Sequence, residues 1–167
     1  MTAQRYQAIF GWFRARPAAL RALKYAKKLS VLGVYAVYGI VLVSALLRHN
    51  GQFWRVLVVP AAVFLLGTLL RAAINRPRPY EAMNFVPLFP KDTKGQSMPS
   101  RHCFSAAAIA VAAGTVWPLL GAFAWVLAAV VAVTRVVTGV HYPSDVLAGL
   151  AFGAGAATLG MFLFPVL

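Results

Sequence analysis

The sequence predicts an all-α integral membrane protein, a helical bundle with about five transmembrane helices preceded by a basic amphipathic helix at the membrane interface. Of its 167 residues, 61% are hydrophobic and only 11% are charged, and the mean hydropathy is +0.75. Soluble domains contain roughly 45–50% apolar residues, so this chain lies well outside their range. The apolar residues also gather into runs of roughly the 20 residues that a bilayer core requires.

Short polar segments separate these apolar runs, which cover approximately 30–47, 53–73, 99–118, 121–139 and 143–165. Asn50-Gly51 and Pro118 are typical of tight turns, whereas 74–98 contains four prolines and is expected to form a long loop on the membrane surface. Gly149 and Gly153 form a GxxxG pattern that favours close helix packing. Nothing in the sequence predicts a second globular domain.

The N-terminal segment is rich in positive charge. Residues 1–28 carry seven of the sixteen Lys and Arg residues, interleaved with aromatic residues and leucine, and Pro17 divides them into two parts. This pattern is typical of an amphipathic segment that binds anionic lipid, so we assign the net charge of +13 to a membrane partner and not to nucleic acid. We therefore predict an amphipathic interfacial segment, 1–28, and a single transmembrane domain, 29–167.

Three polar groups interrupt the apolar runs near their ends. They are Arg71 with Arg78-Pro79, then Pro99-Ser100-Arg101-His102, then Thr134-Arg135 followed by His141 and Asp145. Charged side chains are costly to place at membrane depth, so they are typical of functional sites. If successive runs cross in alternating directions, the three groups converge at one membrane face, and Trp54, Trp117 and Trp125 form an aromatic belt at the other.

These groups, in this order and at helix ends, resemble the three-part signature of the type-2 phosphatidic acid phosphatase family. The likeness covers residues 71–145 and departs from the family pattern at three positions. Arg71 stands where Lys is usual, Arg101 where Gly is commoner, and Thr134 where Ser is usual. Arg71 and Thr134 keep the charge and the hydroxyl, so the departures concern substrate preference more than chemistry.

The resemblance implies a membrane lipid phosphatase, which hydrolyses the terminal phosphate of a lipid phosphate or diphosphate such as phosphatidic acid, phosphatidylglycerol phosphate or polyprenyl diphosphate. It implies that His141 is the nucleophile that forms a phosphohistidine, that Asp145 orients it, and that His102 protonates the leaving group and later activates water. Guanidinium groups and a helix N-terminus suit phosphate oxygens. The expected phosphate-binding residues are Arg71, Arg78, Ser100, Arg101 and Arg135.

The chain is poor in the ligands that a catalytic metal needs. Only Glu81, Asp92 and Asp145 are acidic, whereas two-metal phosphatases use several carboxylates. We therefore expect no metal and no cofactor, with arginine supplying the positive charge.

Other polar residues near the motifs receive a structural interpretation. Arg76, Lys91 and Lys94 fall outside the family motifs and are interpreted as headgroup contacts or surface charge. Cys103 is the only cysteine; it lacks the Cys, five residues, Arg spacing of a thiol phosphatase and is expected to be a buried thiol. A single cysteine also excludes an internal disulfide, so helix packing must stabilise the fold.

Two alternative functions are compatible with these residues. A lipid phosphotransferase would share the phosphohistidine step and differ only in its acceptor. A membrane transporter would need a polar path through the apolar runs, which contain only scattered Ser, Thr and Gly. The sequence indicates no oligomeric state.

The membrane side of the site is also open to two interpretations. We expect an inner-membrane protein with fourteen of the sixteen Lys and Arg residues on the side of the site. The positive-inside rule then favours a cytoplasmic site, whereas the family resemblance implies an extracytoplasmic one.

Overall fold

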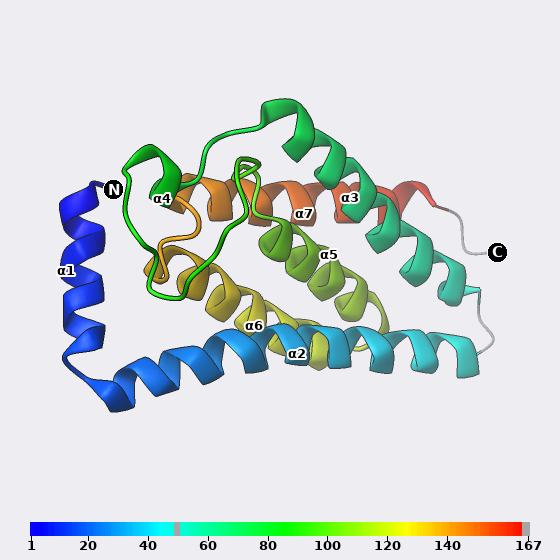
Figure 1. The fold of residues 1–167 in the computed structure, drawn as a ribbon. Helices are drawn as coiled ribbons and strands as arrows, with labels where there is room; N and C mark the ends of the chain where they lie inside the picture. Colours follow the sequence, from blue (N-terminus) through cyan, green and yellow to red (C-terminus); the bar gives the residue numbers. More distant parts are fainter. Residues whose placement is uncertain (49–50, 165–167) are drawn as a thin grey trace.

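Helices dominate the part of the protein that the structure describes. This computed structural model describes residues 1–48 and 51–164 (Figure 1). The centre of the expected turn at 48–52 and the end of the last apolar run lie outside these ranges. The helices are α1 (Ala3–Arg14), α2 (Pro17–Leu47), α3 (Gln52–Ile74), α4 (Pro79–Ala82), α5 (Arg101–Val116), α6 (Pro118–Val137) and α7 (Pro143–Leu163). Neither described range contains a strand, so the all-α prediction is confirmed.

Four segments are long and apolar enough to cross a membrane. They are α2, α6, α7 and the stretch Gln52–Ala82, which contains α3. The fifth apolar helix, α5, has only 16 residues, so its length of about 24 Å is less than the thickness of about 30 Å of a hydrocarbon core. It lies in the middle of the bundle and most of its residues are buried (Figure 1). Protein therefore surrounds most of α5 in place of lipid.

A proline determines where α5 ends. Pro118 is the first residue of α6, a position where its fixed φ and missing N–H fit a helix. The residue before a proline is disfavoured in the helical region, and Trp117 accordingly has an extended backbone with φ −144° and ψ 101°. Helix α5 thus stops at Val116, two residues before the expected end of the run.

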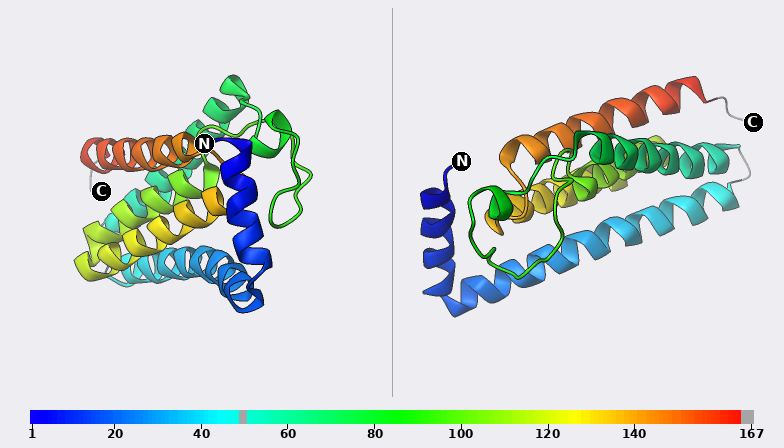
Figure 2. Two further views of the ribbon diagram at one scale, coloured as in Figure 1. Left: turned by 90° about the vertical axis from the view of Figure 1, so that its left-hand side faces the viewer. Right: turned by 45° about the horizontal axis from the view of Figure 1, so that its top comes forward.

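The basic N-terminal segment forms two helices of different orientation. Helix α1 crosses the end of the bundle at a steep angle to α2, as the views of Figures 1 and 2 agree. Pro17 opens α2, which continues without interruption for 31 residues. The expected boundary between residues 28 and 29 therefore lies inside α2, whose first turns carry the second half of the basic segment.

Small residues allow α5 and α7 to pack closely. A Cβ atom at Gly149 would lie 2.8 Å from the carbonyl oxygen of Ser100, and one at Gly153 would overlap the carbonyl oxygen of Phe104. The GxxxG pattern is thus the surface of α7 that contacts α5, as a helix-packing interpretation requires. This contact fixes the start of α5 against the start of α7.

Replacing Gly153 with Ala should destabilise the bundle, because the new methyl group meets the backbone of α5 and not a flexible side chain. We expect a loss of about 1–3 kcal/mol, measured by thermal unfolding in detergent. Gly155→Ala is the matched control, because a Cβ atom there meets nothing within 4 Å; it should be neutral or stabilising by up to about 1 kcal/mol. Equal effects of the two substitutions would contradict the packing model.

Candidate active site

The three polar groups of the sequence converge at one end of the bundle. This is where α3 ends, α5 begins, α6 ends and α7 begins (Figure 1). The buried polar residues here are Arg71, Arg78, Ser97, Ser100, Thr134, Arg135, Thr138, His141 and Asp145. Burial of so many polar groups at one place is costly unless they are paired with each other or with a ligand.

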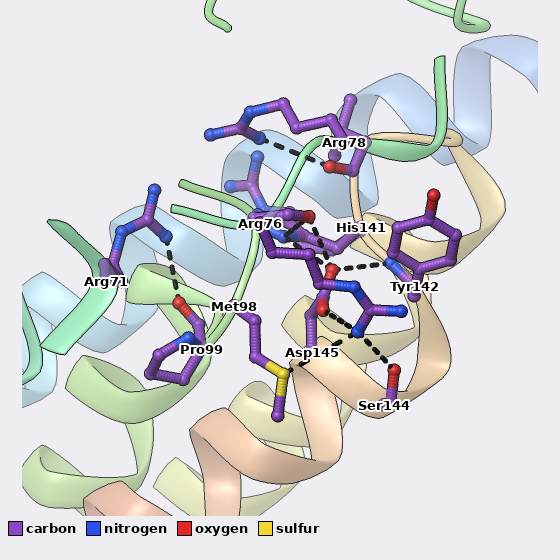
Figure 3. A network of polar contacts seen from close by, with 12 residues as sticks. Arg71, Arg76, Arg78, Met98, Pro99, His141, Tyr142, Ser144 and Asp145 are labelled. Carbon is purple, nitrogen blue, oxygen red and sulfur yellow. Dashed lines mark hydrogen bonds and ion pairs between the residues drawn. The ribbon is translucent and has the colours of Figure 1, made fainter. Parts of the chain in front are cut away.

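Asp145 lies at the centre of this group with its side chain fully buried (Figure 3). Its Oδ2 accepts hydrogen bonds from Ser97 Oγ at 2.5 Å and from the amide of Tyr142 at 2.9 Å. Its Oδ1 accepts from Nη1 of Arg76 at 2.8 Å. Asp145 also lies in the first turn of α7, where the helix dipole favours negative charge. The carboxylate is therefore held from several sides in one orientation.

His141 precedes α7 and is buried beside Asp145. Its Nδ1 lies 3.6 Å from Asp145 Oδ2 and 3.4 Å from Ser97 Oγ. Burial, reinforced by the positive charges of Arg78 and Arg71, lowers the pKa of His141 to about 4, although Asp145 opposes this shift. At neutral pH the imidazole is therefore uncharged. With Nδ1 turned toward Asp145, Nε2 is the nitrogen left for a ligand.

Three buried arginines surround this pair without carboxylate partners. Arg71 donates to the carbonyl oxygen of Pro99 at 3.0 Å, and Arg78 donates to those of Gly95 and Val140 at 3.1 and 3.2 Å. Nε of Arg135 is buried without a hydrogen-bond partner.

Within residues 1–48 and 51–164, the only ion pairs are those of Asp145 with Arg76 and with His141. The buried guanidinium groups of Arg71, Arg78 and Arg135 thus concentrate positive charge at this end of the bundle, which suits an anion with several oxygens.

Ser100 and His102 occupy the start of α5. Ser100 is buried, and its amide donates to the carbonyl oxygen of Asp145 at 2.9 Å. His102 is half-buried and lines a cavity of about 280 Å³. The other lining residues are Val31, Val34, Tyr35, Phe64, Arg101, Ser105, Ala106 and Val131. This cavity is mostly apolar, and its lining residues come from α2, α3, α5 and α6.

Arg101 lies apart from the buried arginines. It is exposed, and its guanidinium carbon is 6.0 Å from the centre of the Phe64 ring at the cavity wall. The structure thus places this expected phosphate ligand at the cavity, exposed but near enough to Arg71 and Arg78 for its charge to act on them.

The interpretation of Arg76 as a surface or headgroup charge is wrong. Its guanidinium pairs with Asp145, donates to Ser144 Oγ at 2.9 Å, and stacks over the ring of Tyr142 at 4.2 Å (Figure 3). Arg76 stands outside the family motifs, and only its position two residues before Arg78 could have indicated its role. Ser97, the other partner of Asp145, left no signal in the sequence.

The two lysines of the surface loop differ from each other. Lys94 is exposed, as expected, whereas Lys91 is half-buried. Burial, together with the positive charges of Arg78 and Arg135, lowers the pKa of Lys91 to about 8. Lys91 therefore belongs electrostatically to the cluster and is not plain surface charge.

The described residues offer no obvious metal site. Across residues 1–48 and 51–164, no three side chains of His, Cys, Asp or Glu are grouped so that they could hold a metal ion. The positive charge of the site comes from arginine.

The structure is a helical membrane bundle with a buried His141–Asp145 pair at one end. Buried arginines without carboxylate partners lie at the same end, and such an arrangement is typical of an anion-binding site in a membrane protein. The chain belongs to the PAP2 superfamily, whose family model matches residues 52–166. This confirms the resemblance to type-2 phosphatidic acid phosphatases.

Named relatives and solved structures agree with this membership. The chain is 38% identical over 105 residues to a lipid A 1-phosphatase of Rhizobium johnstonii, covering 60% of this chain but only 43% of that protein. It is 33% identical over 141 residues to a decaprenylphosphoryl-5-phosphoribose phosphatase of Mycobacterium tuberculosis, covering 79% of this chain and 75% of that protein. The chain thus spans less than half the length of the lipid A 1-phosphatase.

The crystal structure of Aquifex aeolicus LpxE has a TM-score of 0.73 at 21% identity and covers 96% of this chain and 94% of that one. A transmembrane PAP2-type phosphatidylglycerolphosphate phosphatase from Bacillus subtilis has a TM-score of 0.55 at 23% identity, covering 94% of this chain and 90% of that one. These likenesses show the fold and confirm the prediction of an integral membrane helical bundle.

Proposed function

We propose that this protein is a membrane lipid phosphatase that hydrolyses the terminal phosphate of a lipid phosphate or diphosphate through a phosphohistidine on His141. The observation that carries this proposal is the set of three buried arginines without carboxylate partners around the His141–Asp145 pair. A buried surplus of positive charge is stable only with an anion nearby, and an imidazole that is neutral at pH 7 is a competent nucleophile.

In the first step, Nε2 of His141 attacks phosphorus and the bond to the leaving oxygen breaks. Arg71, Arg78 and Arg135 neutralise the charge on the equatorial oxygens, which is the main requirement of phosphoryl transfer. Asp145 stabilises the positive charge that develops on the ring, and His102 gives a proton to the leaving alkoxide or phosphate. In the second step, His102 takes a proton from water, which attacks the phosphohistidine and releases inorganic phosphate.

The apolar cavity beside His102 supports a lipid substrate. Val31 and Tyr35 of α2 and Phe64 of α3 form its walls, so an acyl or prenyl chain could lie there while the phosphate reaches the arginines. The names of the relatives include lipid A and a decaprenylphosphoryl compound, which also pair a phosphate with a lipid. Phosphatidic acid, phosphatidylglycerol phosphate and polyprenyl diphosphate all have this chemistry.

Hydrogen bonds within the protein already engage two of the three carboxylates, which supports a reaction without metal. Asp145 is held by Arg76 and Ser97. Glu81 accepts hydrogen bonds from the amides of Arg78 and Gly95 at 2.8 to 3.0 Å. That leaves Asp92 as the third acidic residue of the chain, and one carboxylate is too few to hold a catalytic metal pair.

We place the protein in the inner membrane with its site toward the cytoplasm, because most of its Lys and Arg residues lie at the site end. A Lys94→Cys variant tests this orientation, since Lys94 is exposed in the surface loop. An impermeant maleimide should label it only after the membrane is permeabilised. The parent chain is the control, because Cys103 is buried. Labelling in intact spheroplasts would place the site outside.

Phosphate release by the purified protein in detergent tests the proposed function. The substrate panel contains phosphatidate, phosphatidylglycerol phosphate, polyprenyl diphosphate and lipid A, each with a chelator present. Wild type should release inorganic phosphate from at least one of them, and His141→Ala should lower the rate by about 10³-fold or more. His102→Asn should slow both steps; with a labelled diphosphate, whose phosphate leaving group needs little protonation, the second step should be slowed more and acid-labile phosphoenzyme should accumulate.

Different failures have different meanings. A fully active His141→Ala variant, or activity that chelation removes, contradicts the mechanism. Phosphate that moves to a second lipid in place of water identifies a phosphotransferase.

Arg76→Met should lower kcat about 10- to 100-fold and change KM little, because Asp145 loses a charged hydrogen bond while the phosphate contacts remain. Arg76→Lys should recover part of the rate by restoring the charge. Lys94→Gln, in the neighbouring loop but exposed, is the matched control and should behave as wild type. If Arg76→Met instead raises KM at unchanged kcat, Arg76 contacts the substrate directly.

A further inference from the structure

Helix α1 is attached directly to the loop that carries His141. The hydroxyl of Tyr6 donates a hydrogen bond to the main-chain carbonyl oxygen of His141 at 3.1 Å, although the residues are 135 positions apart. Burial raises the pKa of Tyr6 to about 12, so the hydroxyl keeps its proton at neutral pH. Tyr6 does not touch the reacting atoms, but it fixes the backbone from which the nucleophile extends.

Aromatic rings extend this contact to a second loop. The ring of Phe85 lies 5.2 Å from that of Tyr6 and 5.6 Å from that of Phe10, centre to centre. Phe10 also packs on Gly139, where a Cβ atom would lie 2.6 Å from the ring and where φ is +76°. Tyr6 and Phe10 are the buried residues of α1. Helix α1 thus contacts both loops of the site through a narrow apolar strip formed by Tyr6 and Phe10.

The remaining surface of α1 and of the first turns of α2 is positively charged. The exposed cations are Arg5, Arg14, Arg16, Arg21, Lys24 and Lys28. Trp12 is half exposed, and the guanidinium of Arg16 lies 4.5 Å from its ring centre. Helix α1 crosses the end of the bundle (Figure 2), so this face would lie along the surface of a membrane that the long helices span, where basic residues and tryptophan bind anionic headgroups.

We propose that anionic lipid, by binding this basic face, holds α1 in contact with the two loops of the site and thereby activates the site through Tyr6. A lipid that binds α1 better when the helix contacts the loops than when it is separated from them shifts the population toward the state in contact. Only Ala15 and Arg16 connect α1 to α2, and the proposal requires α1 to move about this connection while the spans stay in place. Turnover should then rise with a lipid that is not itself a substrate.

The proposal concerns how the site is regulated. Its turnover measurement rests on the proposed function, whereas its hydrogen-exchange measurement does not. The protein is reconstituted in phosphatidylcholine vesicles with increasing phosphatidylserine, a phosphodiester that lacks the terminal phosphate of the proposed substrates. Turnover is measured at constant surface concentration of substrate, and amide hydrogen exchange is measured in parallel. Amide hydrogen exchange reports on α1 and on the loop 138–142 even if the protein turns over no substrate.

For wild type, phosphatidylserine should raise turnover about three- to tenfold, the range expected when one hydrogen bond is secured. It should also slow exchange in both α1 and the loop. The triple variant Arg5→Gln/Arg14→Gln/Arg21→Gln should keep the activity seen in pure phosphatidylcholine and lose both responses. It experiences the same surface pH as wild type, so it controls for the indirect effect of vesicle charge.

The Tyr6→Phe variant distinguishes the binding of lipid to α1 from the effect of that binding on the His141 loop. In this variant phosphatidylserine should still slow exchange in α1, but it should no longer slow exchange in the loop or raise turnover. Tyr25→Phe, an exposed tyrosine in the same basic segment, is the matched control and should respond as wild type. The proposal is overturned if the triple variant or Tyr6→Phe responds fully. It is also overturned if phosphatidylserine leaves α1 unchanged, in which case an acidic protein would be the better partner for this face.

Discussion

The imbalance of charge around Asp145 governs the chemistry of the whole site. One buried carboxylate faces Arg76 and a histidine, while Arg71, Arg78 and Arg135 have no carboxylate of their own. The same surplus that attracts phosphate also helps to keep His141 unprotonated, since the positive charges of Arg78 and Arg71 reinforce the effect of burial on its pKa. On the proposed function, the same arginines would bind the anion and, together with burial, keep the nucleophile unprotonated.

Apolar packing determines the geometry of these polar groups. The absence of side chains at Gly149 and Gly153 brings the backbone of α7 against that of α5. The amide of Ser100 can then reach the main-chain carbonyl of Asp145. The start of α5 and the start of α7 are thus joined at one point, and the side chains proposed as catalytic extend from this packed framework.

The parts of this arrangement that could be predicted are those with a local signal. Arg71, Ser100 and Arg135 stand at helix ends, and alternation of the apolar runs was enough to bring them to one face. Arg76 and Ser97 could not be predicted as partners of Asp145, because their role depends on how the loop between α3 and α5 folds back over α7. The contact of Tyr6 could not be predicted either, since no local pattern links a residue to a carbonyl 135 positions away.

The cavity at the start of α5 has a consequence for what can reach the site. Its walls include the apolar side chains of Val31, Val34 and Phe64, and His102 lines it from the first turn of α5. On the proposed function, a phosphorylated lipid would enter at little cost, since its tail would meet these apolar side chains while only the phosphate exchanges water for arginine. A water-soluble phosphate ester would lose its hydration without any apolar contact in return. The apolar cavity would thus favour membrane phosphates over soluble ones.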